Sequence, residues 1–136
     1  MLQEIPRTRA APDVPQITTE EAAAMARAVI RLFERWQLSD AQAREILGGL
    51  PARTHARWKA GEPGRIDRDL ATRLSLLMGI HKGLRYLFTE AERGYAWVRK
   101  PNPVFGGRTP VEVMAQGDMF SLARVRAYLD AERGGF

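Results

Sequence analysis

The stretch "KPNPVFGGRTP", residues 100–110, interrupts an otherwise helical sequence with three prolines and two glycines in eleven positions. Proline fixes φ and lowers the entropy lost on ordering, and glycine lets the chain reverse. We expect Trp97, just before the loop, to pack against Phe105 within it, and Asn102 to bond to turn backbone. The stretch therefore predicts a rigid loop that fixes how the flanking helices are placed.

Length and composition indicate a globular protein. The 136 residues suit one compact domain or two small ones that share a core, and the contents of 45% hydrophobic and 27% charged residues are not those of a disordered chain. No run of about eighteen apolar residues predicts a transmembrane helix, and no secretory signal pattern begins the sequence. The absence of cysteine excludes disulfides and thiolate zinc sites. We expect a soluble, cytoplasmic protein with no membrane partner.

The net charge of +5 and the sequence pI near 10.2 favour polyanionic partners through phosphate contacts. Arginine supplies most of this charge, and arginine usage also follows the base composition of a genome. The charge therefore permits nucleic-acid binding without establishing it.

Capping residues and apolar spacing predict helices along most of the chain, and no segment alternates as a strand does, so the predicted fold class is all-α. Residues 1–17 carry three prolines and no apolar periodicity, which predicts a flexible arm. Pro51 suits the first turn of a helix, and Thr89 with Glu92 has the spacing of a capping box. The other expected caps are Thr18 or Thr19, Ser39, Asp67 and Thr109.

An enzyme is disfavoured. His55 and His81 lie on separate segments without the spacing of a metal pair, and no nucleophile elbow, His-Glu-x-x-His helix or Walker loop occurs. The segment "FGGRT" would suit an anion-binding nest, or its glycines simply allow a tight turn. We predict no catalytic residue, metal or cofactor.

Residues 39–61, "SDAQAREILGGLPARTHARWKAG", have the pattern of a helix-turn-helix. Trp58 and Ala56 would face the first helix of the pair. The fit has two flaws: Gly48–Gly49 lengthens the turn by about one residue, and His55 stands where an aliphatic core residue is expected. A helical hairpin on any basic surface would look similar. The residues expected to contact DNA are Arg53, Thr54, Arg57 and Lys59.

The segment "AWVRKPNPVFGGRTPVEVM", residues 96–114, resembles the toxin-binding motif of the Xre/MbcA/ParS-type antitoxins of bacterial type II toxin–antitoxin systems. The resemblance extends over roughly residues 20–133, and "RTHARWKAG" is similar, more loosely, to the family's Xre-like helix-turn-helix. It implies a helix-turn-helix domain at 18–80 and a toxin-binding domain at 81–136. Most motif positions are expected to act as a structural scaffold. The matching positions are Trp97, Pro101, Asn102, Phe105, Gly107, Pro110 and Gly117.

The resemblance also implies a function. Members of this family neutralise a toxin encoded beside them, and many repress their own operon. The toxins resemble ADP-ribosyltransferases and use NAD, and the antitoxin's C-terminal helix and tail cover the NAD pocket. A homodimer that forms a hetero-oligomer with the toxin is expected. The residues that would enter the pocket are Tyr128, Glu132, Arg133 and Phe136.

Three alternatives stay open. The tail "ERGGF" could be a frayed terminus, the chain could be a stand-alone helix-turn-helix regulator without a toxin, or it could be an adaptor with neither activity. A neighbouring gene for a small α/β protein with the toxin fold would identify an antitoxin and exclude the stand-alone regulator.

Overall fold

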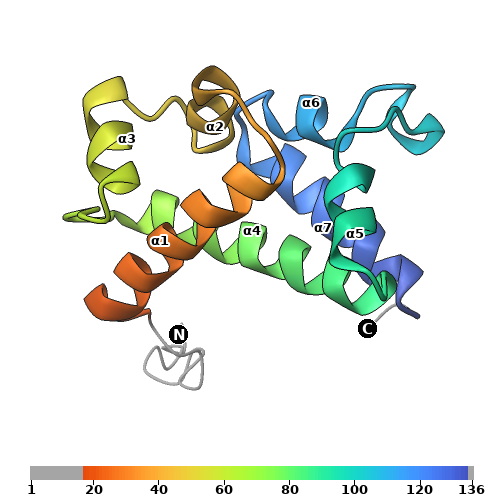
Figure 1. Cartoon of the computed structure of the whole chain (residues 1–136), viewed down its shortest axis with the longest axis horizontal. Coiled ribbons are helices and arrows are strands. Elements are labelled where there is room, and N and C mark those ends of the chain that lie inside the picture. The colour runs from red at the N-terminus through yellow and green to blue at the C-terminus, as the bar shows by residue number, and fades with distance from the viewer. Residues whose placement is uncertain (1–16, 135–136) are drawn as a thin grey trace, which may run out of the picture.

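The computed structural model describes residues 17–134, which form seven α-helices and one short 3-10 helix (Figure 1). No strand occurs within these residues, which confirms the all-α prediction. No helix among them is long and apolar enough to span a membrane. The predicted arm, apart from Ile17, lies outside the described residues. The elements are α1 (Thr19–Arg35), α2 (Asp40–Ile46), α3 (Ala52–Lys59), α4 (Arg68–Leu87), α5 (Ala91–Trp97), η1 (Pro103–Phe105), α6 (Pro110–Met114) and α7 (Met119–Glu132).

Most helix starts follow from local side-chain chemistry. Three helices begin with a reciprocal capping box, in which the cap hydroxyl accepts from a backbone N–H three residues on, and that residue's side chain accepts from the cap N–H. The carboxylates of Asp67 and Asp118 cap α4 and α7. The predicted caps at Ser39, Asp67 and Thr109 are confirmed. The three boxes are Thr18 with Glu21, Ser39 with Gln42, and Thr109 with Glu112.

Two expected starts differ. The capping box at Thr89 is wrong, because the chain leaves α4 in an extended conformation and α5 begins only after Glu90, which makes no side-chain cap. Pro51 stands at the cap position of α3, with ψ at 148°, and not inside its first turn. In both cases the residue before the helix is extended, and the helix starts one residue later than expected.

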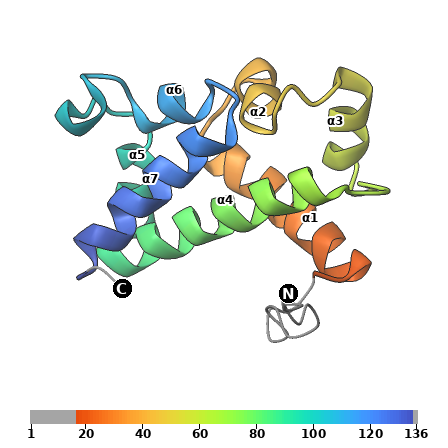
Figure 2. The same ribbon diagram turned by 180° about the vertical axis from the view of Figure 1, so that it is seen from behind.

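One continuous core joins the two halves of the chain, because the long helix α4 belongs to both (Figures 1 and 2). Its N-terminal half packs against α1, and its C-terminal half packs against α5 and α7. Leu74, Leu77, Ile80 and Leu84 recur at three- and four-residue spacing on its buried side. The halves are therefore not separate bodies on a linker.

Helices α4 and α7 run side by side in the same direction at close range. A Cβ atom placed on Gly83 would lie 3.2 Å from the Cβ of Leu129, and one on Gly79 would meet the guanidinium of Arg126. Glycine at these two positions permits the close approach. Helix α7 is thereby fixed on α4 along its length, which determines where its two ends point.

Candidate functional site

The α2–α3 hairpin buries one face of α3 and exposes the other. His55 and Trp58 are 4% and 1% exposed, so the two inward residues of α3 lie one turn apart. His55 occupies the core position noted in the sequence. Ala56 is exposed, so the prediction that it faces α2 is wrong; it lies about 100° around the helix from His55.

Two arginines stand clear on the outer face of α3. Arg53 and Arg57 are exposed, one turn apart, and neither makes an ion pair within residues 17–134. Thr54 is only half exposed. Lys59 pairs with Asp40 at the start of α2, with Nζ 3.2 Å from Oδ1, so part of its charge is already compensated. Of the four residues predicted to contact DNA, Arg53 and Arg57 are the most available.

Two partly buried arginines, Arg44 and Arg73, hold the turn between α2 and α3 by hydrogen bonds to its backbone. Gly48 and Gly49 have φ of 83° and 84°, a conformation that favours glycine. Arg44 Nε donates to the carbonyl of Leu50 at 2.7 Å, and Arg73 of α4 donates to the carbonyl of Ile46 at 3.3 Å. The longer turn noted in the sequence is thus a fixed one.

Burial lowers the pKa of His55 below its ordinary 6.5, and nearby Lys59 and Arg44 lower it further against the opposing effect of Asp40. His81, on α4, also has a lowered pKa, caused first by burial and then by Arg85. Both rings are therefore neutral near pH 7. His55 is buried in the core, whereas His81 is half-buried and lines a hollow of about 240 Å³ between α1, α4 and α5.

The loop between α5 and α6 is closed by its own hydrogen bonds. Asn102 Oδ1 accepts from Val104 N at 3.0 Å, which confirms the expected bond to turn backbone. The Asn102 N–H donates to the carbonyl of Arg108, and its carbonyl accepts from Gly107 N, both at 3.0 Å. Gly106 closes η1 in a left-handed conformation with φ of 69°. The loop has one defined shape, as the prolines and glycines predict.

Three aromatic rings fix this loop to the final helix. The Trp97 and Phe105 ring centroids are 6.4 Å apart in an edge arrangement, which confirms that the two rings meet. Tyr128 of α7 stacks on Trp97 at 6.0 Å and meets Phe105 edge-on at 5.6 Å. Only Phe105 is fully buried; Trp97 and Tyr128 are half-buried. The sequence predicted the contact of Trp97 with Phe105, but it placed Tyr128 among the toxin-contacting residues and missed its part in this cluster.

The last turn of α7 gathers the other predicted toxin-binding residues. Glu132 is exposed, and hydrogen bonding to it, followed by burial, raises the pKa of Tyr128. The guanidinium of Arg133 lies 4.6 Å from the Tyr86 ring centroid and 3.9 Å from Asp130 Oδ1. Tyr128 and Arg133 thus already have partners in the chain, and Glu132 is the most accessible of the three. Phe136 lies outside the described residues.

Comparison with known proteins divides the chain at α4. Residues 15–79 match the antitoxin Xre-like helix-turn-helix domain, and residues 83–135 match the antitoxin Xre/MbcA/ParS C-terminal toxin-binding domain. Over 108 residues the chain is 41% identical to the uncharacterized protein y4oB of Sinorhizobium fredii (strain NBRC 101917 / NGR234), covering 79% of this chain and 83% of that one. The chain belongs to the Xre/MbcA/ParS antitoxin family.

A solved structure agrees with this assignment. This antitoxin-family chain is similar to a chain in the crystal structure of the M. tuberculosis MbcT-MbcA toxin–antitoxin complex, with 27% identity and a TM-score of 0.54. The match covers 82% of this chain and 96% of that one. The predicted family and the helix-turn-helix are thereby confirmed. The predicted division at 80/81 stays a prediction, since both matched regions meet within one helix.

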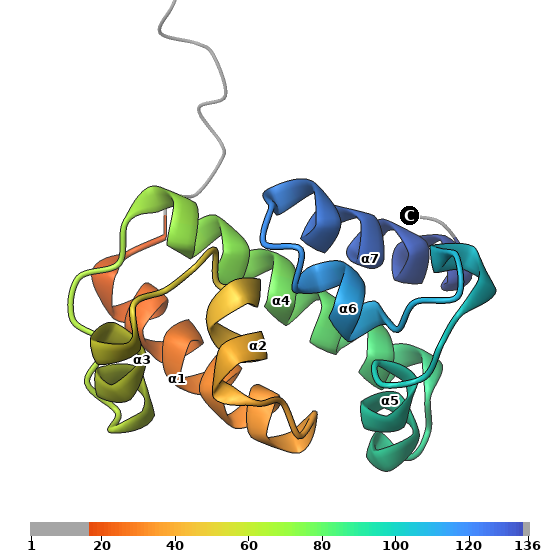
Figure 3. The same cartoon turned by 90° about the horizontal axis from the view of Figure 1, so that it is seen from above.

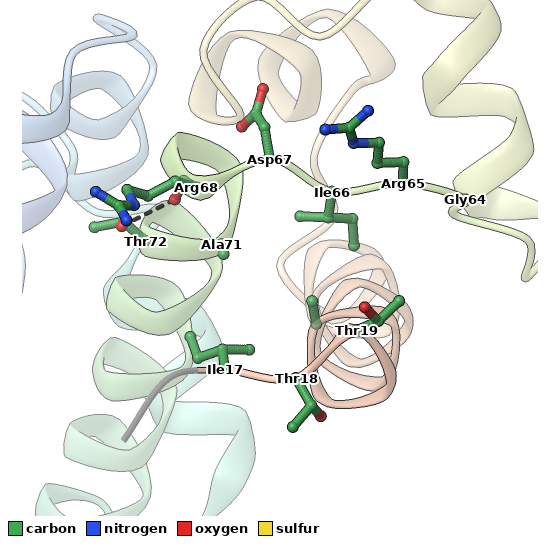
Figure 4. A pocket seen from close by; sticks show the side chains of 11 residues that line it. Ile17, Thr18, Thr19, Gly64, Arg65, Ile66, Asp67, Arg68, Ala71 and Thr72 are labelled. Atoms are coloured by element: carbon green, nitrogen blue, oxygen red, sulfur yellow. Dashed lines mark hydrogen bonds between the residues drawn. The ribbon is translucent and has the colours of Figure 1, made fainter. Parts of the chain in front are cut away.

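A hollow of about 760 Å³ lies where α1 and α4 of this antitoxin-family chain begin (Figure 4). Arg65 and Arg68 stand on its rim, but the Thr18 hydroxyl and the Asp67 carboxylate in its wall already cap helices. No group of acidic or histidine side chains in the described part of the chain could hold a metal. The polar groups in the wall of the hollow are thus mostly engaged in holding the helices and are not available to bind a ligand.

Two exposed apolar side chains were missed in the sequence. Phe120 is 86% exposed at the start of α7, and Val104 is 51% exposed at the tip of the loop. Phe120 falls outside the buried stripe of Leu122, Val125 and Leu129, and that offset was the available signal. Val104 had none, because its exposure depends on how the loop closes.

Proposed function

We propose that this chain binds and neutralises a partner toxin through its C-terminal domain. The observation that carries the proposal is the match of residues 83–135 to a toxin-binding domain, over the same residues that hold the closed loop and the aromatic cluster. The likeness to a chain of the MbcT-MbcA complex supports it. An interface built on a fixed loop and a fixed helix loses little entropy on binding, which favours affinity.

We infer further that the toxin uses NAD, as the family resemblance implies, and that the end of α7 covers its active site. Glu132 and Arg133 would contact groups that otherwise hold the dinucleotide, with Phe136 beyond them. Tyr128 would act mainly by fixing the last turn, since it stacks on Trp97. Helix α7 is fixed on α4, so its end can be presented without reordering the domain.

The second half of the proposal is autorepression through the α2–α3 hairpin, by a homodimer bound to operator DNA. Arg53 and Arg57 are exposed on one side of α3 and suit phosphate contacts or base edges. Thr54 and Lys59 would add less, because one is half-buried and the other is paired. The net charge of +5 favours this partner.

Co-expression with the product of the adjacent reading frame tests the proposal. We expect that protein to co-purify with a tagged copy of this chain, and its NAD-dependent activity to fall to background in the complex. If the adjacent gene product neither binds this chain nor consumes NAD, and this chain alone binds the operator, the chain is instead a stand-alone regulator.

A further inference from the structure

Four large apolar side chains in residues 17–134 are exposed, and two of them share a surface. Ile17 lines the hollow at the start of α1, and Tyr86, 66% exposed, has the guanidinium of Arg133 over its ring. Val104 and Phe120 remain, at 51% and 86% exposure. Single exposed apolar residues are common on soluble proteins, so the pairing of these two is what calls for an explanation.

Arg124 joins them. Its Nη2 atom donates to the carbonyl of Val104 at 3.3 Å, and its guanidinium lies 5.1 Å from the Phe105 ring centroid. Phe120 stands one turn earlier on α7, so its side chain neighbours that of Arg124. We name Val104, Phe120 and Arg124 the α7–loop patch. It combines one cation with two exposed apolar side chains.

The backbone of Val104 is held from both directions. Its N–H donates to Asn102 Oδ1 at 3.0 Å, and its carbonyl accepts from Arg124. The aromatic cluster beneath the loop holds Phe105, the next residue, in the core at 3% exposure. The side chain of Val104 is therefore displayed in a fixed direction, and binding to it costs little ordering entropy. A loop that served only to connect α5 with α6 would not need these bonds.

We propose that the α7–loop patch is the contact surface for the toxin, with Phe120 and Val104 filling an apolar recess and Arg124 pairing with a carboxylate at its rim. The inference rests on the proposed function. The patch lies wholly within the residues that match a toxin-binding domain, which identifies a protein as its occupant. Aromatic and arginine side chains are the types that dominate protein interfaces, whereas a surface for nucleic acid would be more strongly basic.

The patch is separate from the residues proposed to cover the active site. Phe120 is in the first turn of α7 and Glu132 is its last residue, about 18 Å along the helix at 1.5 Å per residue. The toxin would therefore meet α7 at two points. The patch supplies affinity, and the end of the helix blocks the chemistry.

The test measures the dissociation constant between the full chain and the product of the adjacent reading frame by isothermal titration calorimetry. Phe120→Glu and Val104→Glu place a charge in the patch, and Ile17→Glu is the matched control, since it charges another exposed apolar residue of the same chain. We expect each patch variant to bind about thirtyfold more weakly, as for the loss of a hot spot, and the control to stay within about twofold of wild type. Circular dichroism melts check that all three remain folded, and Phe120→Ala gives an uncharged version with about a tenfold loss.

The outcomes separate the two proposals. If wild type binds and the folded patch variants bind equally well, the patch is not the contact surface and the proposed function still stands. If wild type does not bind the adjacent product, both proposals fail. If light scattering shows that the patch variants lose self-association while keeping toxin affinity, the patch joins two copies of this chain and the proposal is overturned.

Discussion

The α2–α3 turn and the loop that contains η1 are built alike and display different chemistry. Each reverses the chain with two consecutive glycines at positive φ, and each is fixed by an arginine that donates to a backbone carbonyl. The hairpin buries its large side chains and shows arginines outward, whereas the loop shows Val104 beside the exposed Phe120. The two lie toward opposite ends of the long axis of the molecule (Figures 1 and 3).

The difference indicates two partners. The hairpin exposes charge without a large apolar side chain, which suits a polyanion. The loop end adds two large exposed apolar side chains to its exposed cations Lys100, Arg108 and Arg124, which suits a protein. Because one core supports both ends, either surface can be altered without unfolding its neighbour, provided that the change stays outside the core.

Core truncations at the two ends should have the largest effect. Phe105→Ala and Trp58→Ala each remove a side chain that is 3% or less exposed, so each should lower the free energy of unfolding by about 3–5 kcal/mol. Trp97→Ala should cost less, because Trp97 is half-buried. Urea unfolding followed by fluorescence and by circular dichroism should give one coincident transition in each variant. Two separate transitions would show that the ends have independent cores.

Removal of the tail should come next. A chain that ends at Ala131 keeps almost all of α7 and the whole α7–loop patch, so it should fold and still bind the toxin. Its inhibition of the toxin's NAD-dependent activity should fall by about tenfold or more, as for the loss of a hot spot. Equal inhibition by the truncated and full chains would mean that the end of α7 covers nothing.

Loss of Arg53 and Arg57 should weaken DNA binding by the α2–α3 hairpin and leave toxin binding unchanged. The double variant Arg53→Ala, Arg57→Ala should bind operator DNA about tenfold or more weakly. The slope of log K against log salt concentration should become shallower by about two for each chain bound. Its melting temperature and toxin affinity should match wild type, because both residues are exposed on α3. Gel shifts on the chain's own promoter measure the first effect. An unchanged affinity would remove α3 from the DNA interface.

The smallest expected effect is on the pH dependence of stability. The pKa of His55 is lowered in the fold, so the unfolded chain takes up the proton more readily. The resulting stabilisation is complete above 6.5, the ordinary value, and is lost as pH falls through the folded pKa. His55→Leu should reduce this loss and leave a remainder from His81. Thermal melts between about pH 5 and 7 measure it, and parallel profiles for variant and wild type would contradict it.

The sequence was most informative where chemistry is local. The caps at Ser39, Asp67 and Thr109 and the bond that the Asn102 side chain accepts from the turn backbone depend on neighbours within a few residues, and they were predicted correctly. Thr89 failed because packing of α4 against α5 delayed the helix start. A capping pattern competes with tertiary contacts, and there the tertiary contacts were stronger.

The candidate sites were less predictable, because exposure is a property of the whole fold. The partner of Lys59 lies nineteen residues away at Asp40, and the stacking of Tyr128 on Trp97 joins two helices. Neither follows from spacing. The same holds for Val104, whose display depends on Arg124 from α7.

The salt dependence of the two affinities tests the contrast between the ends most directly. Wild-type dissociation constants for operator DNA and for the adjacent gene product should be measured between about 50 and 200 mM salt. With two arginine contacts per chain in a dimer, DNA affinity should fall by about a hundredfold, because phosphate contacts release counterions. Toxin affinity should change by less than about threefold, because apolar contacts dominate the patch. A toxin affinity that falls as steeply as that for DNA would show that the C-terminal surface binds by charge, and would contradict this account.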